Sequence, residues 1–219
     1  MVVREKYEQE LLDVQKIFVD LCEMSIEAFE KAVDTFLQKD IERALMIIDQ
    51  DRFINRLEEH IQDEVINLIT RQQPVATDLR RLMVIVSAAS DMERVGDYAV
   101  SIAKETIRLG KTQLYYAPEK ILQLKNMAIK MLRDMLHAFL TEDLIAAADI
   151  AKQDDQMDQL YGHVMEDIQL SAKSHGANLE QVTQLSFICK HMERAADHAT
   201  NLAEALFFLV KGKRYELNS

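Results

Sequence analysis

The sequence predicts an all-α protein in which six long helices form two pseudo-symmetric antiparallel three-helix bundles. Three observations support this prediction. The 219 residues include only 2 prolines and 5 glycines, fewer helix-breaking residues than an ordinary globular chain contains. Apolar residues recur with a helical period between a small number of breaks. The first half of the chain also resembles the second half, which indicates an internal repeat.

Short breaks divide the chain into the six helical segments. They fall at 38–40, 71–74, 109–118, 141–143 and 173–178, and the last helix ends at the start of 211–219. Asp40 is expected to cap the second helix by accepting a backbone N–H. Pro74 ends that helix, because the residue before a proline avoids the helical conformation. Helices of roughly 22–35 residues joined by short turns pack as antiparallel neighbours in a bundle.

The internal repeat sets the predicted division into domains. FLQKDIERAL at 36–45 corresponds to FLTEDLIAAA at 139–148, and DMERVGDYA at 91–99 corresponds to HMERAADHA at 191–199. Each copy contains the residues of three helices. We therefore expect one three-helix bundle in residues 1–110 and a second in residues 118–212.

The third and sixth helices carry acidic residues on their apolar stripes. On the third helix Glu93 falls inside the stripe and Asp97 lies at its edge. Glu193 and Asp197 repeat this arrangement on the sixth helix. The stripes comprise Leu79, Leu82, Val86, Ala89, Val100 and Ile107 in the third helix, and Leu179, Val182, Cys189 and Leu206 in the sixth. An ionised carboxylate facing a core is unfavourable unless it is paired or binds a cation.

Any ion-pair partner for these acids must come from another helix. Arg94 and Arg194 follow the glutamates directly, and adjacent residues of a helix point apart. The preceding helix of each repeat offers more oxygen ligands instead. Asp51 and Asn55 are four residues apart in the first copy, and Asp154 and Asp158 are four apart in the second.

Two such pairs on facing helices form a ring of oxygen ligands. A ring of this kind suits Mg, Ca, Mn or Fe ions, and Zn less exclusively. Closely packed carboxylates repel one another unless a cation or protons intervene. Ion pairing between helices, with no metal, is the alternative interpretation of the same residues.

Composition and motifs disfavour several other functions. A net charge of −11 disfavours nucleic-acid binding and direct docking on anionic lipid. The chain has no Gly-rich phosphate loop, no ExxH pair of the ferritin-like di-iron type and no recognisable catalytic arrangement. It also has neither a secretory signal nor an apolar run long enough to span a membrane, so we expect a cytoplasmic protein that does not insert into the membrane.

Three segments resemble the signature segments of the PhoU family. They are RQQPVATDLR at 71–80, DMERVGDYAVSIAK at 91–104 and HMERAADHATNLAE at 191–204. The similarity extends over essentially the whole chain. It implies a fold of two three-helix bundles, each with a pair of metal-binding acidic residues on which the family holds iron or zinc-type clusters.

The resemblance also implies a ligand set for each bundle. The first site would use Asp51, Asn55, Glu93 and Asp97, and the second would use Asp154, Asp158, Glu193 and Asp197, joined by Asn201. Asn55 stands where a carboxylate is expected, and Ser101 stands where the second copy has Asn201. These differences make the first site poorer in strong ligands, so we expect the second site to bind metal more tightly.

The resemblance further implies a regulator rather than an enzyme. Members of the family couple the phosphate ABC transporter, through its ATPase, to a sensor histidine kinase, and they repress the phosphate-starvation response when phosphate is plentiful. Bundles of this kind are also expected to form a homodimer, and the acidic surface suits a protein that reaches the inner face of the membrane through protein partners. Two alternatives from other classes remain at this point. One is a metal-storage or metal-dependent helical-bundle protein without a signalling role, and the other is a scaffold whose acids bind nothing.

Overall fold

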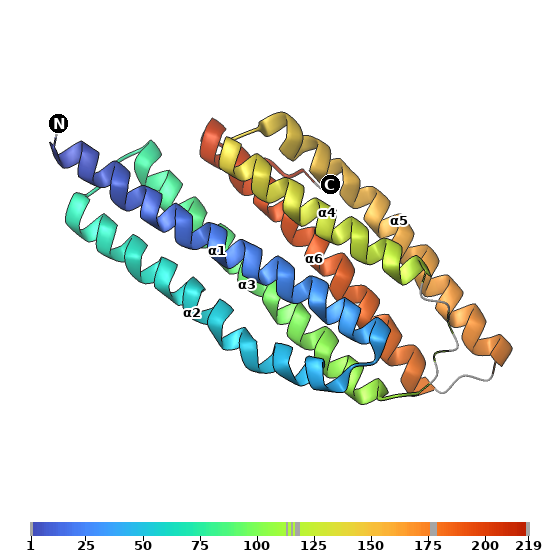
Figure 1. Ribbon diagram of the computed structural model, residues 1–219. Helices are drawn as coiled ribbons and strands as arrows, with labels where there is room; N and C mark the ends of the chain where they lie inside the picture. The colour runs from blue at the N-terminus through green and yellow to red at the C-terminus, as the bar shows by residue number, and fades with distance from the viewer. Residues whose placement is uncertain (1, 113, 115, 117–118, 176–178, 218–219) are drawn as a thin grey trace.

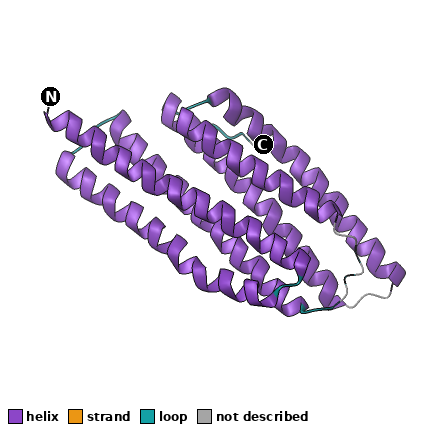
Figure 2. Cartoon of the chain, viewed as in Figure 1, coloured by secondary structure: helices purple, strands orange, loops and turns teal. Residues whose placement is uncertain are grey.

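The fold is built from helices throughout the part of the chain that the structure describes (Figure 2). The structure is a computed structural model that describes residues 2–112, 114, 116, 119–175 and 179–217. The six helices in these residues are α1 (Val2–Gln38), α2 (Ile41–Gln72), α3 (Thr77–Leu109), α4 (Glu119–Thr141), α5 (Leu144–His175) and α6 (Leu179–Lys211). The predicted fold class is confirmed, although α1, with 37 residues, is longer than expected.

The helices form two groups of three that lie side by side (Figure 1). Helices α1, α2 and α3 pack against one another, and so do α4, α5 and α6. The two bundles meet where α3 packs on α6 and where α1 packs on α4, whereas α2 and α5 lie on opposite outer sides. None of the described helices is long and apolar enough to cross a membrane.

An aspartate side chain caps the N-terminus of the second helix in each bundle. Asp40 Oδ1 accepts a hydrogen bond of 3.1 Å from the backbone N–H of Arg43, as the sequence predicts. Asp143 occupies the equivalent place and accepts from the N–H groups of Ile145 and Ala146 at 2.9 and 3.0 Å. These side chains satisfy donors that have no partner within the helix. They fix where α2 and α5 start, and so where the acidic residues further along each helix lie.

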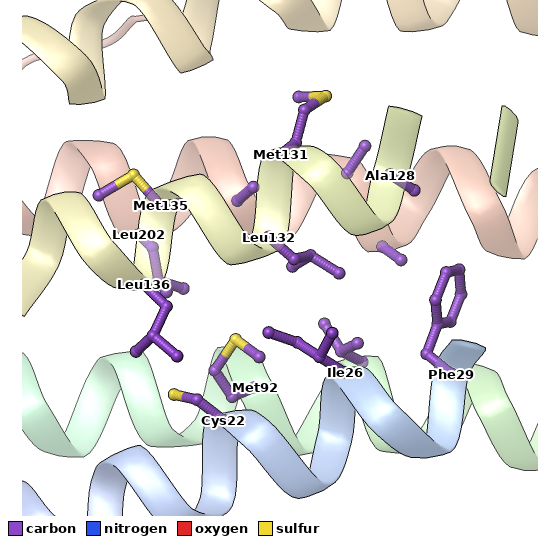
Figure 3. Close-up of a cluster of buried hydrophobic side chains, with 14 of the residues drawn as sticks. Cys22, Ile26, Phe29, Met92, Ala128, Met131, Leu132, Met135, Leu136 and Leu202 are labelled. Carbon is purple, nitrogen blue, oxygen red and sulfur yellow. The ribbon is translucent and has the colours of Figure 1, made fainter. Parts of the chain in front are cut away.

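The two bundles share one apolar core (Figure 3). Ile26 of α1, Met92 of α3, Leu132 of α4 and Leu202 of α6 all belong to it and lie within the same close-up. Because apolar surface from both bundles is buried in this one core, separating the bundles would expose it to water. We therefore treat the pair of bundles as one structural unit.

Helices α3 and α6 are buried over more of their circumference than single stripes predict. Each packs against the other two helices of its own bundle and against its counterpart in the other bundle. The predicted stripes were also wrong at the starts of the two helices, where Leu79 is 36% exposed and Leu179 is 77% exposed. A single amphipathic face describes a helix with one packed side, and these helices have several.

Gly96 brings α2 close to α3 beside the first acidic cluster. A Cβ at this position would lie 3.0 Å from Ile54 Cδ1 and 3.7 Å from Asp51 Oδ1. By contrast, a Cβ at Gly162, on an exposed face of α5, would meet nothing within 4 Å. Substitutions at these two glycines therefore distinguish the effect of packing from the effect of helix propensity.

Gly96→Val should lower the free energy of unfolding by about 1–3 kcal/mol, because the added atoms force α2 and α3 apart. Gly162→Val should instead raise it by a few tenths of a kcal/mol, roughly the difference in helix propensity between valine and glycine. Urea unfolding of both variants measures the two values. Equal effects of the two substitutions would contradict close packing at Gly96.

Candidate metal centre

The second bundle gathers carboxylates from two neighbouring helices. Asp154 and Asp158 lie on α5, and Glu193 and Asp197 lie on α6. One oxygen atom from each of Asp158, Glu193 and Asp197 lies within 4.8 Å of the other two. Asp154 is buried, and its charge acts on Asp197 together with that of Asp158. The structure thus brings the four predicted carboxylates together along the seam between α5 and α6.

The environment of this cluster opposes the full ionisation of its acids. Burial, followed by the charges of Glu193, Asp154 and Asp158, raises the pKa of the Asp197 carboxyl to about 6, and the Lys190 charge opposes the increase. Like charges held close together and away from water favour the protonated form. A bound cation would remove the same repulsion without a proton.

Glu193 is the most buried acid of the α6 pair, with 7% of its surface exposed. Its Oε1 accepts a hydrogen bond from the Lys190 ammonium. Its Oε2 is buried and has no hydrogen-bond partner among the residues that the structure describes. A buried carboxylate oxygen without a partner is unfavourable. This oxygen can therefore bind a ligand, such as a cation, that the chain itself does not supply.

The first bundle has the equivalent arrangement with fewer charges. Asp51 and Asn55 on α2 face Glu93 and Asp97 on α3. Burial raises the pKa of the Asp51 carboxyl, the Asp97 charge raises it further, and the hydrogen bond from Asn55 opposes the increase. That bond joins Asn55 Nδ2 to Asp51 Oδ2 over 3.4 Å. The charges of Glu93 and Asp97 act on one another in the same cluster.

Glu58 belongs to this first cluster although the predicted ligand set omits it. Burial raises the pKa of the Glu93 carboxyl, followed by the charge of Asp97, while Arg94 opposes the increase and Glu58 and Asp51 add to it. Glu58 lies seven residues after Asp51, and so two turns along the same face of α2. This spacing from Asp51 is the sequence signal that could have identified it.

The two clusters differ in how closely their ligand atoms approach. Within the described part of the chain, only the second bundle brings three His, Cys, Asp or Glu ligand atoms within 4.8 Å of one another. In the first bundle, Asp51 Oδ1 and Asn55 Oδ1 are both buried without a hydrogen-bond partner in the described residues. Asp97 Oδ2 instead accepts a 3.0 Å hydrogen bond from Arg94.

Asn201 does not join the second carboxylate cluster. Its side-chain amide donates a 3.2 Å hydrogen bond to Asp91 Oδ1 on α3, in the other bundle. Asp91 Oδ1 also lies 2.8 Å from His198 Nδ1. In this structure Asn201 therefore contacts α3 rather than the second ligand set, and its role as a metal ligand stays a prediction. Asn201 lies one turn after Asp197 on α6, and its side chain faces α3.

A polar cluster that the sequence analysis missed joins the two bundles at α3 and α6. The Tyr98 hydroxyl lies 3.2 Å from His198 Nε2, and the His198 ring also contacts Asp91. The Tyr98 ring stacks on His191, with centroids 5.6 Å apart. Asp91 and His191 occupy equivalent repeat positions, as do Tyr98 and His198, so the cluster surrounds the pseudo-twofold axis. Burial lowers the pKa of His191, and the Arg194 charge lowers it further.

Comparison with known proteins identifies the family of the chain. Residues 18–106 and 121–206 each match the PhoU domain, once in each bundle. The chain belongs to the PhoU family. The phosphate-specific transport system accessory protein PhoU homolog of Streptococcus pneumoniae is 33% identical over 216 residues, which are 99% of this chain and 100% of that protein. The homolog of Clostridium acetobutylicum is 31% identical over 218 residues, with coverage of 99% and 100%.

Solved PhoU structures share the fold of this PhoU family member. The crystal structure of the phosphate transport system regulatory protein PhoU from Streptococcus pneumoniae superimposes with a TM-score of 0.89 at 32% identity, over 96% of this chain and 99% of that one. The crystal structure of PhoU from Pseudomonas aeruginosa gives a TM-score of 0.89 at 26% identity, over 94% and 100%. Both bundles and their mutual arrangement are therefore those of the family.

Asp197→Asn should stabilise this PhoU family member when no metal is bound. At about pH 7.5 the substitution should raise the free energy of unfolding by about 1–2 kcal/mol, because the raised pKa opposes ionisation in the folded chain. The stabilising effect of the protonated carboxyl is fully present below the unfolded pKa and is lost as pH rises through about 6. The gain from asparagine should therefore disappear at about pH 4.

Thermal unfolding in chelator at both pH values tests this dependence. Asp155→Asn is the control, because Asp155 is exposed on α5 and its removal should change the free energy of unfolding by less than about 0.5 kcal/mol. A loss of stability in Asp197→Asn at neutral pH would contradict the described electrostatics.

Proposed function

We propose that this chain is an accessory regulator of phosphate-specific transport and does not act as an enzyme. It represses the phosphate-starvation response by coupling the ATPase of the phosphate ABC transporter to a sensor histidine kinase. The observation that carries the proposal is membership of the PhoU family over both bundles. The coverage of relatives named as phosphate-specific transport accessory proteins, end to end, supports the same role.

The proposal includes a metal ion in the second bundle. Asp154, Asp158, Glu193 and Asp197 would hold it. The buried Glu193 Oε2, which has no hydrogen-bond partner among the described residues, supports this assignment. An all-carboxylate donor set fits hard or borderline cations such as Mg, Mn or Ca, and the family resemblance puts iron or zinc first. A bound cation would neutralise the repulsion within the cluster and link α5 to α6. Stabilisation by such a ligand grows with its concentration relative to Kd.

The first bundle is proposed to bind metal more weakly. Asn55 replaces the carboxylate that the second bundle supplies with Asp158. Arg94 also holds one oxygen of Asp97. A neutral amide in place of that carboxylate and a guanidinium bound to Asp97 both reduce the attraction for a cation.

Titration of chelator-treated protein with Zn²⁺ in a calorimeter measures this inequality. We expect two classes of site, with Kd values that differ by about tenfold or more, a ratio that corresponds to about 1.4 kcal/mol. Glu193→Gln with Asp197→Asn should remove the tighter class, and Glu93→Gln with Asp97→Asn should remove the weaker one. Equal affinities, or retention of all metal after the first pair of substitutions, would contradict the assignment.

A pull-down from phosphate-replete cells tests the regulatory role. The tagged chain should enrich the transporter ATPase and the sensor kinase, and deletion of its gene should activate a phosphate-starvation reporter in replete medium. A homodimer at the inner face of the membrane belongs to the same proposal, and cross-linking of the tagged protein tests it. If neither partner is enriched above a tagged unrelated acidic helical protein, and the reporter stays silent, the role is wrong.

A further inference from the structure

Lys190 places a positive charge inside the second carboxylate cluster. It lies on α6 one turn before Glu193 and donates a hydrogen bond to Glu193 Oε1. Its Nζ also lies 5.3 Å from the centre of the Tyr161 ring on α5, within the range of a cation–π interaction. The Lys190 side chain is 42% exposed, whereas that of Glu193 is 9% exposed. The lysine therefore reaches from the solvent side over the buried acid.

The lysine and a metal ion would attract the same carboxylate. The Lys190 charge acts on both Glu193 and Asp197, so it partly neutralises the cluster when no metal is present. Glu193 then has one oxygen held by the ammonium and the other buried without a described partner. A cation bound through Oε2 alone would sit close to the ammonium and be repelled by it. A cation bound through both oxygens would have to displace the ammonium.

The Tyr161 ring gives the displaced ammonium a nearby place to stay. Tyr161 lies on α5 three residues after Asp158, and so on the same side of that helix. The lysine contacts this ring while it bonds Glu193. It can therefore leave the carboxylate by turning about its flexible side chain, without any movement of the helices.

The first bundle lacks this lysine. Ser90 occupies the repeat position equivalent to Lys190 and is exposed. The positive charges that act on the first cluster are those of Arg94, which pairs with Asp97, and of Lys104, which acts on Asp51. The competition at Glu193 is thus particular to the second bundle.

We propose that Lys190 is an internal competitor for the metal of the second bundle. It occupies Glu193 when the site is metal-free, moves onto the Tyr161 ring when a cation binds, and so sets the metal concentration at which the site fills. This inference rests on the proposed metal binding and adds a means of tuning it. Four carboxylates favour tight binding in this bundle, and Lys190 reduces the affinity that they would otherwise give.

Calorimetric titration of Zn²⁺ into Lys190→Met tests the proposal. All proteins carry Glu93→Gln and Asp97→Asn, so that only the second bundle is titrated. Loss of a hydrogen bond between two charged groups should tighten Zn²⁺ binding roughly tenfold. Lys130→Met is the matched control, because Lys130 forms an exposed ion pair with Asp134 on α4 of the same bundle. It makes the same change in net charge and should leave the Kd within about twofold.

Thermal unfolding gives a second readout that a purely structural lysine would not produce. In chelator, Lys190→Met should unfold at a lower temperature than the parent, because the carboxylates lose their counter-charge. In Zn²⁺ its gain in unfolding temperature should exceed that of the parent, because the metal binds more tightly. Lys190→Arg keeps the ion pair and should bind Zn²⁺ like the parent. If Lys190→Met does not fold, Lys190→Gln takes its place.

The outcomes separate this inference from the metal proposal. If Zn²⁺ binds neither the parent nor any Lys190 variant, the metal assignment of the second bundle is wrong. If Zn²⁺ binds the parent and Lys190→Met with equal affinity, or binds the variant more weakly, the competitor role is wrong while metal binding stands. If Lys130→Met tightens binding as much as Lys190→Met, the effect is one of net charge and the competitor role is again wrong.

Discussion

The packing of α3 against α6 is the constraint on which the rest of the structure depends. Because each of these helices also packs against the other two helices of its own bundle, apolar or small residues must cover most of its circumference. Polar side chains are then confined to the narrow seams between helices. On α3 and α6 the acids that face α2 and α5 form the carboxylate clusters, and the residues at the mutual seam form the Asp91–His198 contact.

The carboxylate clusters follow from helical spacing and antiparallel packing. Two acids four residues apart lie one above the other on a helix, and the facing helix presents a second such pair. Burial in the seam makes their mutual repulsion stronger than it would be in water. Burial first, and then this repulsion, raise the pKa of the Asp197 carboxyl. In a folded protein that keeps such a cluster in each of two bundles, bound protons, a lysine or a metal ion offset the repulsion between the carboxylates.

The cluster at the α3–α6 seam connects the surroundings of the two sites. Tyr98 follows Asp97 in the chain, and His198 follows Asp197, and these two aromatic side chains meet at the pseudo-twofold axis. In the sequence, one residue of each carboxylate cluster is therefore directly followed by a residue that contacts the other bundle.

Helix boundaries, the repeat and the four acids of the second cluster could be predicted from the sequence, because breaks and spacings of four residues are local signals. Lys190 and the Asp91–His198 contact could not be predicted in the same way. A single apolar stripe assigns one packed side to α3 and α6, so residues turned toward the other bundle were read as lying off the stripe. The same limit applies to Asn201, which the family resemblance implies as a ligand beside Asp197 and whose amide contacts Asp91.

The most direct test of the account is anomalous diffraction from crystals of the full chain grown with Zn²⁺, measured on both sides of the zinc absorption edge. The account predicts a strong peak between α5 and α6, at roughly 2.0–2.2 Å from oxygen atoms of Glu193 and Asp197 and of at least one of Asp154 and Asp158. Peaks found only at exposed surface side chains, with the Glu193–Lys190 ion pair intact and no density in this seam, would contradict it.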